Sequence, residues 1–130
     1  MFNYERRLEA ELRKVDSDAL NRDILRKYYS FSVAEGISLA RVVKRLCHLR
    51  TLSKILNKEY ANATKDDIVE LVAKIETAKL SPWTKRDHKL ILRSFYQWLR
   101  SYEKGRYPPE VAWMPIARIS ESSVRKQDLL

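Results

Sequence analysis

Residues 36–56 read GISLARVVKRLCHLRTLSKIL, and this stretch decides the fold class. Gly36 suits the left-handed position that ends a helix, and Ser38 can cap the start of the next one. Beyond Ser38, apolar residues recur at helical spacing on one side of the stretch, at Leu39, Val42, Leu46, Leu49 and Leu56. The residues on the opposite side are Arg41, Lys44, Arg45, His48 and Thr51. The stretch therefore predicts an amphipathic helix from residue 38 to about residue 56.

Two further helices are predicted before this stretch. The first covers about residues 3–14 and has its apolar positions at Leu8, Leu12 and Val15. The second starts at a cap provided by Asp16 or Ser17 and ends at about Glu35. Its apolar stripe consists of Leu20, Ile24, Tyr28 and Phe31.

Two more helices are predicted after it. Thr64, followed by Asp67, resembles a capping box, and the helix that it starts has an apolar face at Ile68, Leu71, Val72 and Ile75. Ser81 and Pro82 are a strong start signal for a helix that runs to about Glu103 and stops at Gly105. Beyond that helix, prolines are expected to prevent further regular helix, at Pro108, Pro109 and Pro115.

Composition narrows the protein class. A chain of 130 residues suffices for one domain with a modest core. A single cysteine, Cys47, excludes an internal disulfide, and with only His48 and His88 beside it a zinc site is not expected. No apolar run approaches the ~18 residues that a membrane span needs. We therefore expect a soluble, cytoplasmic protein without metal or cofactor.

The positive charge is concentrated in two segments. The net charge is +9, and residues 37–58 carry six basic and no acidic residues. Residues 81–107 carry seven basic and two acidic residues. Surface helices usually carry both acidic and basic residues, and Glu–Lys pairs one turn apart stabilise them. The segment without acidic residues cannot form such pairs within itself. Clustered basic charge predicts a polyanionic partner.

The predicted helix over residues 82–103 repeats the two-sided pattern. Its inner face consists of Ile91, Phe95, Trp98, Leu99 and Tyr102, which we interpret as core residues rather than a base-stacking platform. Its outer face carries Arg86, Lys89, Arg93 and Arg100, with Lys85 at the edge. We expect His88 to be buried near the inner face and Trp83 to pack against a helix end. An apolar face that anchors a helix and a basic face that meets phosphates suit a helix that enters the major groove.

At this point several stretches resemble the core-binding domain of tyrosine recombinases, in particular archaeal integrases. These are Gly36-Ile37-Ser38-Leu39-Ala40-Arg41-Val42, Ala63-Thr64-Lys65-Asp66-Asp67-Ile68, Ser81-Pro82-Trp83-Thr84-Lys85-Arg86-Asp87, Leu92-Arg93-Ser94-Phe95-Tyr96-Gln97-Trp98-Leu99, Tyr107-Pro108-Pro109-Glu110-Val111-Ala112-Trp113 and Lys126-Gln127-Asp128-Leu129-Leu130. The resemblance rests on their order and spacing over residues 17–130. It implies a SAM-like, all-α orthogonal bundle of four to five helices with an irregular C-terminal linker.

The resemblance also implies a domain division and a DNA interface. Residues 1–16 would be an extra N-terminal helix, residues 17–107 the core-binding domain, and residues 108–130 a linker to a catalytic domain. Two helices would enter the major groove of double-stranded DNA as one jaw of a clamp. The contacts expected on this chain are Ser38, Arg41, Lys44, Arg45, Thr84, Lys85, Arg86, Lys89 and Arg93, and His48 lies on the same basic face.

The chemistry of the recombinase family is missing from the sequence. That chemistry uses a His-x-x-Arg element and a C-terminal tyrosine nucleophile. Here the third residue after His48 is Thr51, the third after His88 is Ile91, and no tyrosine follows Tyr107. We therefore expect a DNA-binding fragment, not an enzyme. The alternative is a helical interaction module whose N-terminal helix mediates self-association through Leu8, Leu12 and Val15.

Overall fold

The computed structural model describes residues 4–116, which form α-helices and one 3-10 turn with no β-strand among them. In chain order, the elements are α1 (Tyr4–Asp16), α2 (Arg22–Ala34), α3 (Leu39–Leu56), the turn η1 (Tyr60–Asn62), α4 (Lys65–Thr77), α5 (Pro82–Leu99) and α6 (Pro109–Ala112). The predicted all-α bundle is confirmed. Between residues 4 and 116, no helix has the length and apolar character needed to span a membrane.

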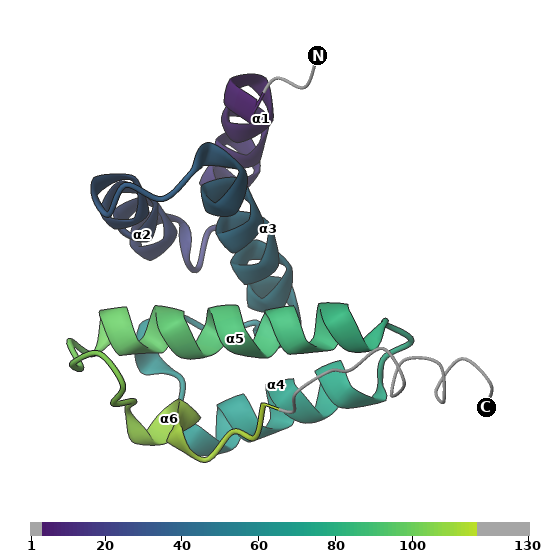
Figure 1. Cartoon of the computed structure of the whole chain (residues 1–130). Helices are drawn as coiled ribbons and strands as arrows, with labels where there is room; N and C mark the ends of the chain where they lie inside the picture. Colours follow the sequence, from purple (N-terminus) through teal and green to yellow (C-terminus); the bar gives the residue numbers. More distant parts are fainter. Residues whose placement is uncertain (1–3, 117–130) are drawn as a thin grey trace.

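α3 is the helix around which the others are arranged. Figure 1 shows α1 alongside the upper part of α3, α2 beside it, and α5 crossing its lower part at a steep angle. α4 lies beneath α5, and the short α6 packs on both. Because α3 has neighbours on several sides, five of its apolar residues are buried, namely Val42, Val43, Leu46, Leu49 and Leu52.

The helix caps follow the sequence signals. The hydroxyl of Ser38 accepts the backbone N–H of Arg41, and that of Ser81 accepts the N–H of Thr84, with Pro82 at the first helical position of α5. Thr64 and Asp67 form a capping box at the start of α4, in which each side chain accepts from the backbone N–H of the other residue. These three predicted helix starts are therefore confirmed, because each depends on residues within four positions of one another.

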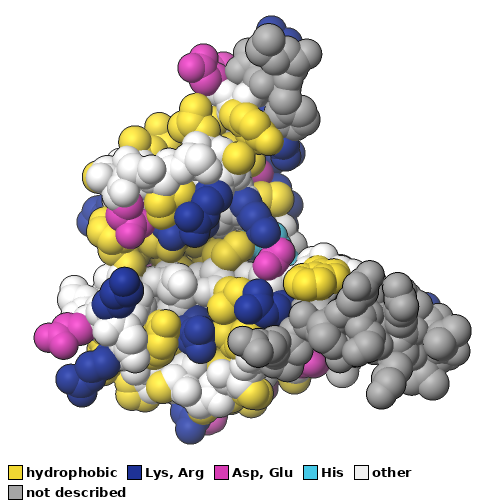
Figure 2. Space-filling model, viewed as in Figure 1, with side chains coloured by type: hydrophobic (Ala, Val, Ile, Leu, Met, Phe, Trp, Pro, Cys, Tyr) yellow, Lys and Arg dark blue, Asp and Glu magenta, His cyan; other side chains and the backbone are white. Residues whose placement is uncertain are grey.

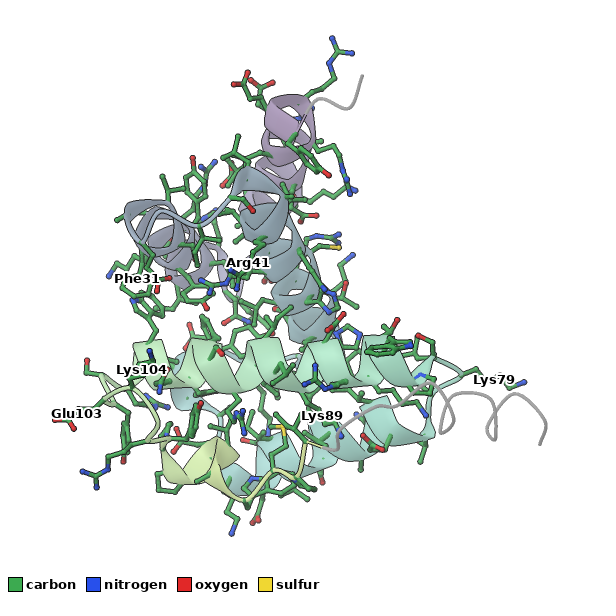
Figure 3. The ribbon with its side chains drawn as sticks, viewed as in Figure 1. Phe31, Arg41, Lys79, Lys89, Glu103 and Lys104 are labelled. Carbon is green, nitrogen blue, oxygen red and sulfur yellow. The ribbon has the colours of Figure 1, made fainter. Side chains whose placement is uncertain are left out.

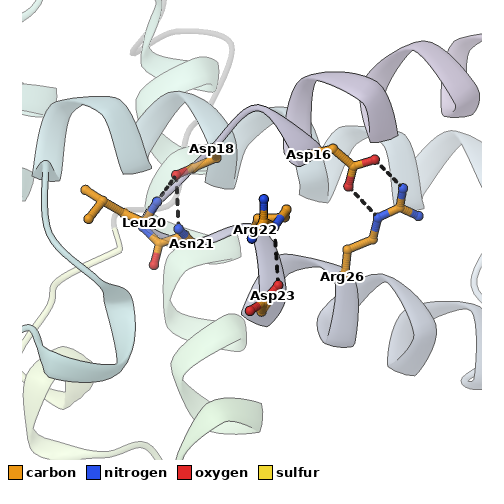
Figure 4. Close-up of polar contacts among 7 residues, drawn as sticks. All are labelled: Asp16, Asp18, Leu20, Asn21, Arg22, Asp23 and Arg26. Carbon is orange, nitrogen blue, oxygen red and sulfur yellow. Dashed lines mark hydrogen bonds and ion pairs between the residues drawn. The ribbon is translucent and has the colours of Figure 1, made fainter.

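The start of α2 differs from the prediction. Asp18 Oδ1 accepts the backbone N–H groups of Leu20 and Asn21, at 3.1 and 3.0 Å, which holds this part of the chain in a turn (Figure 4). α2 therefore begins at Arg22, and the predicted cap at Asp16 or Ser17 is wrong. Leu20, predicted on the apolar stripe, is 43% exposed. An aspartate that bonds to the backbone two and three residues ahead competes with helix formation.

α1 is an integral part of the core. Leu8 and Val15 are buried among residues of this chain, and α1 packs chiefly on α3. The carboxylate of Glu11 is buried with them and accepts a hydrogen bond of 2.6 Å from Arg50 Nε on α3. Of the three residues proposed for self-association, only Leu12 is partly exposed. The other two are used within the fold.

Aromatic rings join α2 to α5. Tyr28 meets Phe95 edge to face, with ring centroids 5.1 Å apart, and its centroid lies 5.0 Å from that of Trp98. Phe95 is fully buried, so the interpretation of this residue as core is confirmed. Phe31, labelled in Figure 3, lies 5.8 Å from Trp98 at the edge of the cluster. It remains 39% exposed.

α5 is shorter than predicted. It ends at Leu99, and Ser101 then adopts a left-handed conformation with φ of 59°. The N–H of Tyr102 donates back to the carbonyl of Gln97 at 2.9 Å, which closes the end of the helix. The predicted end at Glu103 is wrong. Tyr102 consequently leaves the predicted inner face and is 39% exposed.

The segment after α5 packs on the core. The prolines do not prevent a short helix, because Pro109 occupies the first position of α6. Val111 is fully buried and Met114 is 4% exposed. The packed part of the domain therefore extends beyond the predicted boundary at residue 107. Residues 117–130, which hold most of the predicted linker, lie outside the described residues.

A buried polar group of residues fixes the connection between α3 and α4. Asn21 donates from Nδ2 to Ser53 Oγ and to the carbonyl of Lys58, at 2.7 and 3.0 Å, and its Oδ1 accepts the N–H of Tyr60 at 2.8 Å. Tyr60 is fully buried, and its hydroxyl donates to the carbonyl of Leu49 at 2.6 Å. The side-chain amide of Asn21 therefore provides hydrogen-bond partners for three polar groups at the end of α3 and in the connection that follows it.

Replacing Asn21 with alanine should destabilise the fold strongly. Three buried polar groups would each lose a partner, at about 1 kcal/mol apiece, so the free energy of unfolding should fall by about 3 kcal/mol. Urea denaturation followed by circular dichroism measures this change. Asn62→Ala, at an exposed position, should change stability by less than about 0.5 kcal/mol. Equal effects of the two substitutions would contradict the role given to Asn21.

Candidate nucleic-acid interface

Of the predicted contact residues, Lys44 and His48 lie where α3 crosses α5, against Asp87 and His88. Figure 2 shows Lys and Arg side chains gathered over α3 and along α5 on one face of the molecule. On α3, Ser38 is the cap and Arg41 projects from the first turn of the helix (Figure 3). Arg41 is exposed, and its guanidinium forms no ion pair or hydrogen bond with any residue from 4 to 116. Arg41 is therefore available to a ligand.

Three other cations of α3, Lys44, Arg45 and Arg50, pair with carboxylates from neighbouring elements. Lys44 Nζ lies 2.9 Å from Asp87 Oδ2 of α5, and the Arg50–Glu11 pair joins α3 to α1. The absence of acidic residues from this stretch excludes pairs within the helix. It does not exclude pairs between helices, which only the tertiary structure reveals. α3 needs few acidic residues of its own, because the helices packed around it supply carboxylates for several of its cations.

Arg45 is a structural residue. Its side chain is 17% exposed and donates to Ser32 Oγ at 3.0 Å and to Glu35 Oε1 at 3.1 Å. The guanidinium also lies over the ring of Tyr28, 5.4 Å from the centroid. These contacts tie α3 to α2, so the sequence-based assignment of Arg45 to an open basic face is wrong.

The predicted outer face of α5 is partly covered by the segment around α6. Lys89 is 9% exposed, and its Nζ lies 2.8 Å from Glu76 Oε1 and 3.3 Å from the carbonyl of Pro115. The guanidinium of Arg93 lies 4.5 Å from the ring centroid of Tyr107. Periodicity predicts which residues share a face, but it does not predict what packs on that face. The assignment of Lys89 to a solvent-exposed face is wrong.

Two arginines of α5 have unsatisfied donors. The Nε atoms of Arg86 and Arg93 are buried and have no acceptor within the described part of the chain. Arg86 is half-buried and follows directly on the first turn of α5. In the same turn, Thr84 Oγ1 lies 3.0 Å from the hydroxyl of Ser81, and Lys85 Nζ donates to the carbonyl of Glu76 at 2.8 Å. Arg86 is therefore the α5 cation least committed to the fold.

His48 and His88 meet between α3 and α5. Their Nδ1 atoms lie 2.8 Å apart, so one ring donates a hydrogen bond and the other accepts it. His88 is 6% exposed, as expected. Burial is the main cause that lowers the pKa of His48 to about 4, and a charged His88 lowers it further. Burial also lowers the pKa of His88, so both rings are neutral at pH 7.

Two features of this surface were missed by the sequence analysis. The first is Asp87, whose carboxylate pairs with Lys44. In the sequence, this role is indicated only by the fact that Asp87 is the one acidic residue between positions 81 and 102. Trp83 is 50% exposed on the solvent side of α5, instead of packing against a helix end. The open part of the interface therefore consists of Ser38, Arg41 and Lys44 on α3, beside the exposed indole of Trp83. Arg86 shares the face of α5 that carries Lys89 and Arg93.

Between residues 4 and 116, no group of three or more His, Cys, Asp or Glu side chains is placed to hold a metal ion. No protein-family model, no curated protein and no solved structure was found to match this chain. The function is therefore argued from the geometry of the α3–α5 crossing.

Stability measurements should show that Lys89 contributes to the fold and that Arg41 does not. Lys89→Ala removes an ion pair and a buried aliphatic stem, so the free energy of unfolding should fall by about 2 kcal/mol. Arg41→Ala, at an exposed side chain that has no partner among residues 4–116, should change it by less than about 0.5 kcal/mol. Urea unfolding of both variants tests the assignment. A Lys89 variant as stable as the parent chain would show that this side chain is not part of the fold.

Proposed function

We propose that this chain binds duplex DNA through the face where α3 crosses α5, as the core-binding domain of a tyrosine recombinase that serves DNA integration or recombination. The observation that carries the proposal is that two exposed cations of α3, Arg41 and Lys44, lie where this helix meets α5. The contact between Lys44 and Asp87 brings α3 to the first turns of α5. Arg41 lies one turn before Lys44 on the same helix.

The scaffold supports such a role because it holds the two helices rigidly. The ion pair and the histidine pair both join α3 to α5 at the crossing. A major groove about 12 Å wide accepts one helix, and cations on a neighbouring helix then meet the flanking phosphates. The net charge of +9 favours association with a polyanion.

The proposal assigns no catalytic step to this chain. Neither histidine belongs to a His-x-x-Arg element, and the two rings are bonded to each other. The transesterification would belong to a catalytic domain of the same recombinase, which is the proposed protein partner. The role also implies a cytoplasmic location, where the protein meets DNA.

Binding to duplex DNA should depend steeply on salt. Two phosphate contacts, from Arg41 and Lys44, should give a slope of log K against log salt of about −1.8, since each contact contributes about −0.9. Fluorescence anisotropy with a labelled duplex measures this slope. A slope near zero would exclude phosphate contacts and with them the proposal.

Charge reversal should locate the interface. Arg41→Glu should weaken binding by about 10-fold or more and reduce the salt slope by about one contact. Lys65→Glu makes the same change of net charge on α4, which lies on the other side of α5 from α3 (Figure 1). Its first-turn position favours a carboxylate, so the control should fold and retain most of the affinity. Equal losses in the two variants would point to attraction by net charge alone.

A further inference from the structure

The histidine pair has a geometry that accepts one proton. In the neutral pair, one ring donates from Nδ1–H and the other accepts at its bare Nδ1 across 2.8 Å. A proton added at Nε2 of the donor ring leaves this bond in place and makes it charge-assisted, which strengthens it. A second proton would put two N–H groups face to face, so the pair takes up one proton and not two.

The charged neighbours decide whether that proton is bound. On α5, Asp87 favours a charged pair, and on α3, Lys44 opposes it one turn before His48. His48 also lines an open groove of about 540 Å³ between α1 and α3, which gives solvent access to the ring. The other polar or ionisable residues along this groove are Tyr4, Arg7, Glu11, Lys14, Cys47 and Arg50.

Asp87 links the pair to the proposed DNA interface. Its carboxylate is engaged by Lys44 at 2.9 Å, and this ion pair is open to solvent, with 51% of the lysine side chain exposed. Exposed ion pairs are weak, so a phosphate that binds Lys44 can replace the carboxylate. The negative charge of Asp87 then acts on the histidine pair without the compensating ammonium group. The phosphate itself adds a further negative charge nearby.

We propose that duplex binding at the α3–α5 crossing is coupled to the uptake of one proton by the His48–His88 pair, with Asp87 released from Lys44 as the group that stabilises the protonated rings. This inference rests on the proposed function, because the coupling needs a phosphate at Lys44. By reciprocity, the same coupling makes the affinity for duplex DNA rise as the pH falls. The proton comes from the buffer, and no covalent bond changes.

The pH window from 7 to 5.5 isolates the pair. Carboxylates titrate near pH 4 and lysines above pH 10, and the chain has only two histidines. Uptake of one proton changes affinity by at most ~10-fold per pH unit, so we expect a rise of about 5-fold over this range. His48→Gln combined with His88→Gln should abolish the rise while retaining salt-dependent binding at pH 7.

Calorimetry of the unaltered chain counts the protons directly. Titrations with duplex DNA at pH 6, in buffers of different ionisation enthalpy, should give an uptake of about half a proton for each complex, in line with the 5-fold rise. Lys44→Gln frees Asp87 before DNA binds, so the pair is already more protonated and the count should fall. A count of zero in the unaltered chain, with salt-dependent binding intact, overturns the proton coupling and leaves the proposed function standing. An unchanged count in Lys44→Gln overturns the part given to Asp87, and no binding at any pH overturns the function itself.

Discussion

The central constraint on this molecule is that α3 must serve as core and as surface at once. α1, α2, α4 and α5 all pack on it, so its apolar residues are buried around more than half of the helix. Only a narrow strip that begins at Arg41 and Lys44 remains for a partner. The positions of the other helices follow from this arrangement, because each must cover a different part of the same helix and bring a counter-charge or hydrogen-bond partner with it.

Local sequence signals were sufficient where the structure depends on neighbouring residues. The caps at Ser38, Thr64 and Ser81 involve contacts within four positions, and all three helices start as predicted. The start of α2 is also a local effect, yet Asp18 can act as a helix cap or as a turn residue. The sequence permits both, and burial of Asn21 against the connection after α3 favours the turn.

The candidate interface was less predictable because its character depends on tertiary contacts. Helical periodicity placed Lys89 and Arg93 on one face of α5 correctly, but the segment that follows α5 folds back over that face. Charge counting identified α3 as acid-free, yet Glu11, Glu35 and Asp87 reach it from other elements. The sequence thus predicts the helices that carry the cations. It does not predict which cations remain open to a ligand.

The burial of each ion pair indicates which cations a phosphate can recruit. Arg50 and Glu11 are 14% and 6% exposed, so separating them would leave a buried carboxylate without a partner, at a cost of about 3 kcal/mol or more. Lys44 and Asp87 are 51% and 29% exposed, and separating them costs at most about 1 kcal/mol. A phosphate can therefore displace Asp87 from Lys44 but cannot displace Glu11 from Arg50. In the proposed complex, this ranking lets a polyanion bind at the exposed end of α3 without breaking the contacts that hold α1 in place.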